Sequence, residues 1–343
     1  MKRFIKVCGL VLLQTILLIS CGSTKVTDDS KSISYFEEKE AYTLSCVGEN
    51  SSKYYEEAVP YLKEGKQVEL EKLIAKWAVE APNDPDLFVI KYNLENQRAY
   101  EPIVMMSDVK PENGPYMLSK NDKGEDVFIY ETMNINKDGI KDAADVLEEA
   151  LKIHPVRVDM WFGLIKTYLD GSFWKEAENT FYRCLKELEK NDNNWLWMNN
   201  KEIVHNGDRT EYDNDFILTT HDYIAYLHMQ PEPETYYAAQ RMTDAMLKAF
   251  PSNPILLNLV AVDYFKLGEL DKGIGYLEKA FEIAPNDMVI VGNLAYFSCV
   301  KNDREKFDFY ADIMRNSGDP EFVQKADQLY NEFFTKVPDY MQR

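Results

Sequence analysis

Side chains of the same kind return every 34 residues along much of this 343-residue chain. Pro251 and Pro285 are 34 residues apart, and small residues keep the same step at Ala143 and Ala177. Further series at this step are Ala239, Gly273 and Phe307; Thr243, Leu277 and Ala311; Met246, Ala280 and Met314; and Ala150 and Cys184. A fixed period of this length is the signature of a repeat protein, in which each unit buries its apolar side against its neighbours.

Two insertions interrupt the period. Repeats start at residues 51, 85, 158, 220, 254 and 288, so the steps that end at 158 and 220 are longer than the others. Helical repeats are therefore expected at 35–100, 136–191 and 220–343, where a last helix closes the array. A β-hairpin insertion is expected at 101–135 and an irregular insertion at 192–219.

Residues 254–287 carry the complete pattern of one repeat. Large and small side chains alternate at set places in it: Leu257, Val260, Ala261, Tyr264, Gly268, Gly273, Leu277, Ala280 and Pro285. This pattern resembles the tetratricopeptide repeat (TPR), in which two antiparallel helices form each unit of 34 residues. In that family the small residues let the helices approach closely, and the proline ends the second helix. The resemblance implies an all-α fold, an α-α superhelix or TPR-like solenoid, with a small β-hairpin insertion.

The two insertions differ in character. Residues 103–106 and 127–130 are apolar runs typical of strands, and 121–124 is typical of a hairpin turn, so a small β-structure should grow out of the turn between two helices. The second insertion is rich in Asn and Asp and contains Trp195 and Trp197. These tryptophans either cover an edge of the helical array or form a surface on which sugar rings stack.

The TPR resemblance also implies a concave groove lined by the first helix of each repeat. The family's groove positions here include Phe162, Lys166, His221, His228, Asn258, Val262, Phe265 and Tyr296. This mixed apolar and aromatic set, with few charges, suits an amphipathic helix or an extended peptide segment. The alternative is that some of these side chains pack against the insertions or the last helix. The family's Lys and Asn clamp for an acidic C-terminal tail is absent, because Phe162 stands where a Lys is needed.

The first residues resemble a lipoprotein signal peptide. Three basic residues precede an apolar run at 7–19, which is too short to cross a bilayer as a helix. Cys21 follows a small residue, as in the lipobox of bacterial lipoproteins. That resemblance implies a signal peptide at 1–20, lipid such as palmitate on Cys21, and a flexible tether at 21–34. Gly22 favours the outer membrane of a cell envelope, whereas the periplasmic or surface orientation stays open, and an ordinary secretory signal is the alternative.

The charge of the chain excludes some partners. It has 39 Lys and Arg against 58 Asp and Glu, a formal net charge of −19, which becomes −22 once the three bases of the signal are removed. Binding to nucleic acid needs clustered cations, so no nucleic-acid partner is expected. An acidic body is also repelled by anionic lipid, so the lipid anchor would hold the membrane. Cys46, Cys184 and Cys299 lie on separate segments and are expected to be buried apolar side chains.

No catalytic or metal-binding motif accompanies the repeats, so we expect no enzyme activity, no cofactor and no metal. Residues 134–145 resemble the calcium loop of EF-hands, because oxygen-bearing side chains alternate around Gly139. Against this, Asn134 is neutral and Lys141 stands where an apolar residue is usual. The competing interpretation is a turn in which Asp138 caps the next helix.

The sequence therefore predicts a membrane-anchored, non-catalytic TPR scaffold that binds a protein or peptide partner in the cell envelope. The alternative is a surface lipoprotein for glycan or nutrient capture, in which the aromatic insertions hold the ligand. The identity of the partner and the oligomeric state cannot be read from the sequence.

Overall fold

The computed structural model describes residues 50–111, 114–197, 201–202 and 209–335. These residues divide into an N-terminal unit, 50–212 with 222–242, and a C-terminal unit, 213–221 with 243–335. The predicted signal peptide, Cys21, the tether and Cys46 lie outside the described residues. Within the described ranges, no helix combines the length and apolar character that a membrane span requires.

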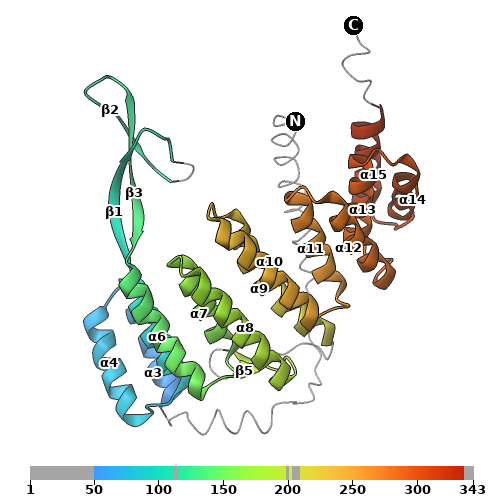
Figure 1. Ribbon diagram of the computed structural model, residues 1–343. Coiled ribbons are helices and arrows are strands. Elements are labelled where there is room, and N and C mark those ends of the chain that lie inside the picture. The colour runs from blue at the N-terminus through green and yellow to red at the C-terminus, as the bar shows by residue number, and fades with distance from the viewer. Residues whose placement is uncertain (1–49, 112–113, 198–200, 203–208, 336–343) are drawn as a thin grey trace. The chain divides into compact units, whose positions relative to one another are not determined.

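The N-terminal unit is built from antiparallel helix pairs (Figure 1). The pairs are α3 (Ser51–Lys63) with α4 (Gln67–Glu80), α5 (Pro85–Arg98) with α6 (Lys137–Ile153), and α7 (Val158–Asp170) with α8 (Trp174–Asn191). Next come α9 (Arg209–Met229) and α10 (Pro233–Ala249), whose residues 213–221 and 243–249 belong to the C-terminal unit. The small residues of the 34-residue pattern, such as Ala143 and Ala177, are fully buried, as close helix packing requires.

Local signals fix where these helices begin and end. Asp84 caps α5 by accepting a hydrogen bond from the Asp86 N–H, and Pro85 fills the first helical position, where no amide donor is needed. Gly65 has φ +68° in the turn after α3, a conformation that glycine adopts without steric cost. Caps and turns of this kind therefore mark the repeat boundaries by local interactions alone.

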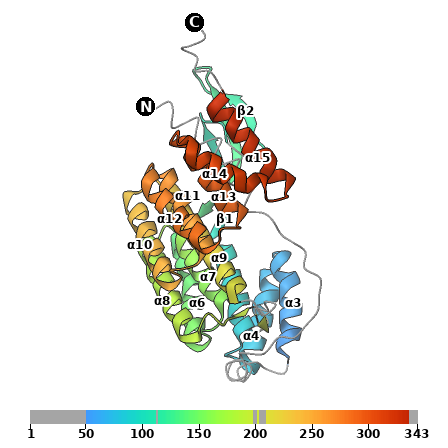
Figure 2. The same cartoon turned by 90° about the vertical axis from the view of Figure 1, so that its right-hand side faces the viewer.

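The C-terminal unit is also built from paired helices (Figure 2). It contains α11 (Pro254–Lys266), α12 (Leu270–Ile283), α13 (Met288–Val300), α14 (Arg304–Arg315) and α15 (Pro320–Tyr330), followed by a π-helical turn at Asn331–Thr335. A Cβ placed on Gly273 of α12 would lie 2.7 Å from the Ala261 carbonyl oxygen of α11. The two small residues thus permit a close helix contact, and the predicted all-α, TPR-like fold is confirmed.

A three-stranded antiparallel sheet, here called the arm, is inserted between α5 and α6 (Figure 1). Its strands are β1 (Tyr100–Ser107), β2 (Met117–Lys120) and β3 (Asp126–Ile135), in the order β1-β3-β2. Gly124, with φ +79°, donates its N–H to the Asn121 carbonyl at 2.9 Å, which closes the turn between β2 and β3. The small β insertion predicted from sequence is therefore confirmed.

The second insertion differs from the prediction. Two short strands, β4 (Leu196–Trp197) and β5 (Lys201–Glu202), pair in it, and α9 then begins at Arg209. The predicted irregular segment at 192–219 is therefore wrong from 209 onward. In α9, Phe216 is buried and its ring lies 6.1 Å from that of Phe250, so tertiary packing stabilises the first part of this helix. The polar composition of this part gave no local signal for a helix.

The two tryptophans of this insertion are placed differently. Trp195 is buried, and its indole N–H donates to the Asn193 side chain at 2.7 Å, whereas Trp197 is exposed. A platform on which both rings stack against a sugar is therefore not formed.

The resemblance of residues 134–145 to a calcium loop is not matched by the backbone. Asn134 lies in β3, opposite Glu101, and the helix α6 begins three residues later. Asn136 caps α6 by accepting from the N–H groups of Asp138 and Gly139, so the cap predicted at Asp138 lies two residues earlier. A strand followed directly by a helix does not let these oxygens converge on one ion.

Cys184 and Cys299 are free and buried, as predicted from the sequence. Burial raises the pKa of both thiols, to about 12 for Cys299. Both are therefore packed as small apolar side chains and stay protonated at neutral pH.

Candidate functional site

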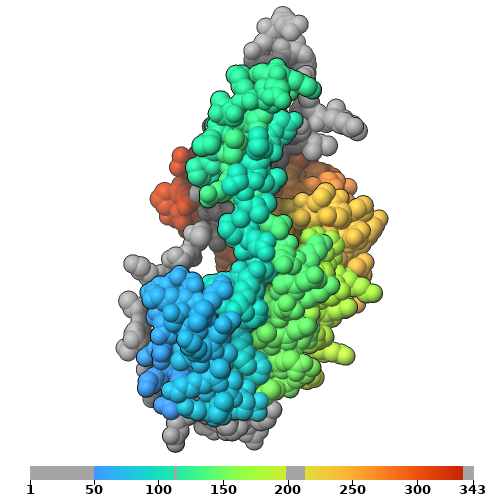
Figure 3. All heavy atoms as spheres, turned by 90° about the vertical axis from the view of Figure 1, so that its left-hand side faces the viewer, coloured from blue at the N-terminus to red at the C-terminus, as the bar shows by residue number. Residues whose placement is uncertain are grey.

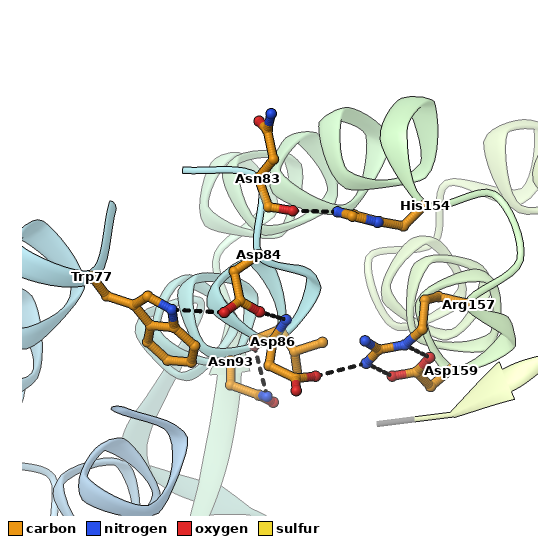
Figure 4. Close-up of polar contacts among 9 residues, drawn as sticks. Trp77, Asn83, Asp84, Asp86, Asn93, His154, Arg157 and Asp159 are labelled. Atoms are coloured by element: carbon orange, nitrogen blue, oxygen red, sulfur yellow. Dashed lines mark hydrogen bonds and ion pairs between the residues drawn. The ribbon is translucent and has the colours of Figure 1, made fainter. Parts of the chain in front are cut away.

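A buried ion cluster holds the first helices of two successive repeats together (Figure 4). Arg157, just before α7, is fully buried; its guanidinium donates to Asp86 of α5 at 3.0 Å and to both carboxylate oxygens of Asp159 at 2.9 and 2.8 Å. Burial by itself lowers the pKa of Arg157, but the bonds to the two carboxylates outweigh it and raise this pKa above its ordinary value. The cluster therefore stays charged, and it fixes α5 beside α7.

Two further hydrogen bonds extend this contact (Figure 4). The Trp77 indole N–H of α4 donates to Asp84 at 2.9 Å, and the His154 ring nitrogen Nε2 lies 2.6 Å from the Asn83 carbonyl oxygen. Burial lowers the pKa of His154, more than its bond to the Asn83 carbonyl raises it, so the ring is neutral at neutral pH. Polar bonds thus join the turn before α5 to α4 of the preceding repeat and to the turn between α6 and α7.

Partly exposed tyrosines gather on the helices that this network positions. We call the following set the tyrosine patch: Tyr92 of α5, Tyr100 of β1, Lys166 and Asp170 of α7, and Tyr223 and Tyr226 of α9. The Tyr100 hydroxyl donates to Asp170 at 2.6 Å, and the Lys166 ammonium pairs with the same carboxylate. The Tyr92 hydroxyl lies 2.9 Å from the hydroxyl of Thr167. Asp170 is therefore the charged centre of the patch.

The α9 side of the patch packs on α7 and α8. The Tyr223 hydroxyl donates to the Phe162 carbonyl at 3.1 Å, and the two rings meet edge to face at 6.3 Å. The Tyr226 ring lies 6.4 Å from that of Trp174, the first residue of α8. These contacts hold the tyrosine rings in place at the surface.

The chemistry of the patch is that of a binding surface. Burial raises the pKa of Tyr92, Tyr100, Tyr223 and Tyr226, and the nearby Asp170 raises each of them further. The four phenols therefore stay neutral and serve as hydrogen-bond donors and aromatic faces. In the ranges that the structure describes, no group of His, Cys, Asp and Glu is arranged to hold a metal ion.

The groove residues predicted in the N-terminal unit have three different environments. Phe162 is buried beneath Tyr223, so it supports the face and is not accessible to a partner. Lys166 is exposed and lies in the tyrosine patch. The His228 ring lies 5.7 Å from that of Tyr236, where α9 turns into α10.

The groove residues predicted in the C-terminal unit form polar and aromatic pairs. His221 lies 2.9 Å from a carboxylate oxygen of Asp263, and the Asn293 amide donates to Asn258 at 2.7 Å. The ring of Phe265 meets that of Tyr296 at 5.9 Å. Val262 is buried and, like Phe162, offers no surface.

Sequence reasoning missed most of the tyrosine patch. The family's groove positions on the first helix of each repeat include Lys166. They do not include Asp170 of the same helix or Tyr92 of α5. Tyr100 belongs to the root of the arm, outside the repeat pattern altogether. The spacing of Tyr223 and Tyr226, three residues apart on one helix, was the signal that could have found the α9 side.

The similarity of this chain to known proteins is limited to the fold. No family model matches the chain, and no curated protein matches it in sequence. Among solved structures it is similar to PilF of Pseudomonas aeruginosa, at 10% identity over 81% of this chain and 96% of that one, with a TM-score of 0.35. It is also similar to YrrB, described as a TPR protein with an unusual peptide-binding site (15% identity, 56% and 84% covered, TM-score 0.33), and to MamA (16%, 58% and 94%, 0.31).

These likenesses do not identify a function. The class of the protein follows from its own helix pairs, their 34-residue period and the close contact at Gly273: it is a TPR-like helical-repeat protein with a β insertion.

Proposed function

We propose that this protein is a non-catalytic scaffold, anchored to a membrane of the cell envelope, that binds a polypeptide segment on the tyrosine patch. The observation that carries the proposal is the set of partly exposed tyrosines that α5, β1 and α9 bring around Asp170 of α7. Tyrosine is enriched at protein interfaces because it offers a large, rigid contact area together with one polar atom. The buried Arg157 cluster supports the proposal, since it preorganises the helices that carry the patch.

The patch favours a guest with apolar or aromatic side chains and at least one hydrogen-bond donor. Ring faces of Tyr92 and Tyr226 suit apolar side chains, and Asp170 accepts hydrogen bonds. Lys166 and Tyr100 already donate to that carboxylate, so a backbone amide or a cationic side chain of the guest would share or displace the Lys166 contact. Lys166 is well exposed, so its displacement costs little.

Photo-crosslinking in the producing cells tests the binding surface. A photoreactive amino acid in place of Lys166 should crosslink to a distinct partner, which mass spectrometry then identifies. The matched control is the same amino acid at Lys186, an exposed position on the second helix of that repeat. Equal crosslinking from positions 166 and 186, or none from 166, contradicts the proposed site.

The anchor has its own test. The signal-like start and the small residue before Cys21 support lipidation there. Labelling with an alkyne analogue of palmitate should mark the wild-type chain and should be lost in Cys21→Ser. Label that persists in this variant removes the anchor from the proposal and leaves the binding surface untouched.

A further inference from the structure

The arm carries most of the exposed apolar surface among the described residues. More than half of their exposed large apolar side chains lie in its strands or in the connection between β1 and β2: Ile103, Val104, Met105, Met106, Val109, Tyr116, Met117, Leu118, Met133 and Ile135. Figure 3 shows the arm as a narrow column of side chains that extends away from the helices of its own unit. Exposed apolar side chains that gather in this way mark an interaction site.

Strand register sorts these side chains onto two faces. Cross-strand partners point to the same face, and Val104 pairs with Glu131, Pro102 with Met133, and both Met106 and Met117 with Ile129. We call the resulting set the methionine face: Val104, Met106, Met117, Ile129, Glu131 and Met133. Four of these side chains are more than half exposed: Val104 and Met106 at 67%, Met117 at 66% and Met133 at 52%.

The opposite face of the arm is more polar and partly closed. The Tyr116 ring meets Phe128 edge to face at 5.4 Å, and the Lys110 ammonium lies 5.3 Å from the centre of the same tyrosine ring. An ion pair between Lys120 and Asp126, at 3.0 Å, lies on this face as well. Ile103, Met105 and Leu118 also lie on this face, and of these only Leu118 is more than half exposed, so the methionine face is the larger open apolar surface. Its thioether side chains adapt well to a partner's shape.

One carboxylate stands within the methionine face. Glu131 is exposed and lies opposite Val104, between the Ile129 and Met133 positions of β3. In the described part of the chain, no ion pair joins Glu131 to a Lys, Arg or His, whereas Asp126 on the other face has Lys120. An apolar face with a single uncompensated negative charge complements an apolar segment that carries a positive charge.

We propose that the methionine face is a docking surface for a segment of a partner protein in which apolar side chains flank a Lys or Arg that pairs with Glu131. A second copy of the chain fits less well, because a two-fold pairing of these faces brings one Glu131 toward the other. A bilayer fits less well too, since β1 and β2 are the edge strands of the described sheet, whose outer backbone groups lipid cannot satisfy, and the chain has a net charge of −19. This site is distinct from the tyrosine patch and does not depend on it.

Selection from a displayed library of short random peptides tests the proposal with the full mature chain. Peptides are selected on the wild-type protein and depleted on Met106→Ser/Met133→Ser, and the survivors are measured individually by fluorescence anisotropy. The survivors should combine apolar residues with a Lys or Arg. Their affinity should fall about tenfold or more in the double variant and in Glu131→Lys, about 1.4 kcal/mol per tenfold step. Peptides with that cation changed to Glu should instead prefer Glu131→Lys.

Two controls separate this site from other surfaces. Leu118→Ser removes an equally exposed apolar side chain from the opposite face and should leave the affinity unchanged. Lys166→Ala alters the tyrosine patch and should also leave the affinity of these peptides unchanged. The proposal for the arm and the proposed function can therefore be refuted independently of each other. Circular dichroism checks that each variant folds. If the double methionine variant does not fold, the binding of both kinds of peptide to Glu131→Lys tests the proposal instead.

Three results overturn the proposal. The first is surviving peptides that carry no Lys or Arg, or that bind the wild type and Glu131→Lys equally. The second is methionine-dependent flotation with phosphatidylethanolamine–phosphatidylglycerol vesicles, which makes the face a membrane surface. The third is a dimer in sedimentation that Glu131→Lys or the double variant dissociates, which makes it a self-interface.

Discussion

Replacement of Arg157 by methionine measures how strongly the buried ion cluster stabilises the N-terminal unit. The side chains of Asp86 and Asp159 are only 6% and 9% exposed, and that of Arg157 is 0% exposed. Methionine fills much of the volume but leaves two carboxylates without a cation in a site that water barely reaches. Removal of one partner from a buried ion pair costs roughly 3–5 kcal/mol, so the free energy of unfolding should fall by that amount.

A triple variant distinguishes two causes of this destabilisation: the loss of the ion pairs themselves, and the burial of two carboxylates that no longer face Arg157. In Asp86→Asn/Arg157→Met/Asp159→Asn none of the three charges of the cluster remains, so most of the loss should be recovered. About 0.6–2 kcal/mol should persist, because each of the two aspartates lies in the first turn of its helix, where negative charge is favourable by about 0.3–1 kcal/mol. As a surface control, Lys152→Met breaks an ion pair with Glu149 that is 64% and 65% exposed, and it should cost less than about 0.5 kcal/mol.

Urea unfolding followed by circular dichroism gives these free energies, and hydrogen exchange of the α5 and α7 amides assigns the loss to the N-terminal unit. The second measurement is needed because two units need not unfold in one transition. The reasoning is refuted if Arg157→Met costs no more than Lys152→Met. It is also refuted if the triple variant is as unstable as the single one, since stranded charge would then not be the cause.

Two other predictions concern a titrating ring and a helix contact. Burial lowers the pKa of His154, so the unfolded chain takes up its proton first, and stability should be full above about pH 6.5 and fall below it by at most about 1.4 kcal/mol per pH unit. His154→Gln, which keeps a donor near Asn83, should lose this part of the pH dependence in urea titrations at about pH 7 and about pH 5.5; an unchanged slope contradicts the assignment. A Cβ on Gly273 would lie 2.7 Å from the Ala261 carbonyl, so Gly273→Ala should cost about 1–3 kcal/mol in thermal unfolding. Gly275→Ala on the same helix meets nothing within 4 Å and should gain about 0.5–1 kcal/mol, and equal effects would contradict the close-contact argument.

The repeat architecture could be predicted because it depends on the spacing of residues that are close together in the sequence. Residues such as Gly273 and Ala177 are small because the two helices of one pair pack closely there, and the ring of Pro85 favours the first position of a helix. The start of α9 could not be predicted in the same way. Its first turns are polar, and the burial of Phe216 depends on a contact with Phe250 that no local pattern reveals.

The candidate site was less predictable than the fold. Family positions identify which helix lines a face, but whether a side chain there is accessible depends on the neighbouring repeat. Phe162 lies beneath a tyrosine of α9, whereas Lys166, one turn further along α7, is exposed. Tyr100 joins the patch only because the arm leaves α5 at that point, a tertiary fact with no periodic signal.

The way the arm is joined explains how the fold accommodates it. The Asn136 N–H donates to the Ala99 carbonyl at 2.8 Å, so the chain leaves α5 and re-enters α6 at nearly the same place. A Cβ on Gly139 would lie 3.0 Å from the Ala99 Cα, which shows that the two helix ends meet as closely as in an uninterrupted repeat. Because the ends of the insertion are adjacent, its length hardly affects the packing of α5 on α6. The arm is therefore free to carry exposed apolar side chains that the helical core neither needs nor buries, and its methionine face can evolve with a partner while the repeats keep their spacing.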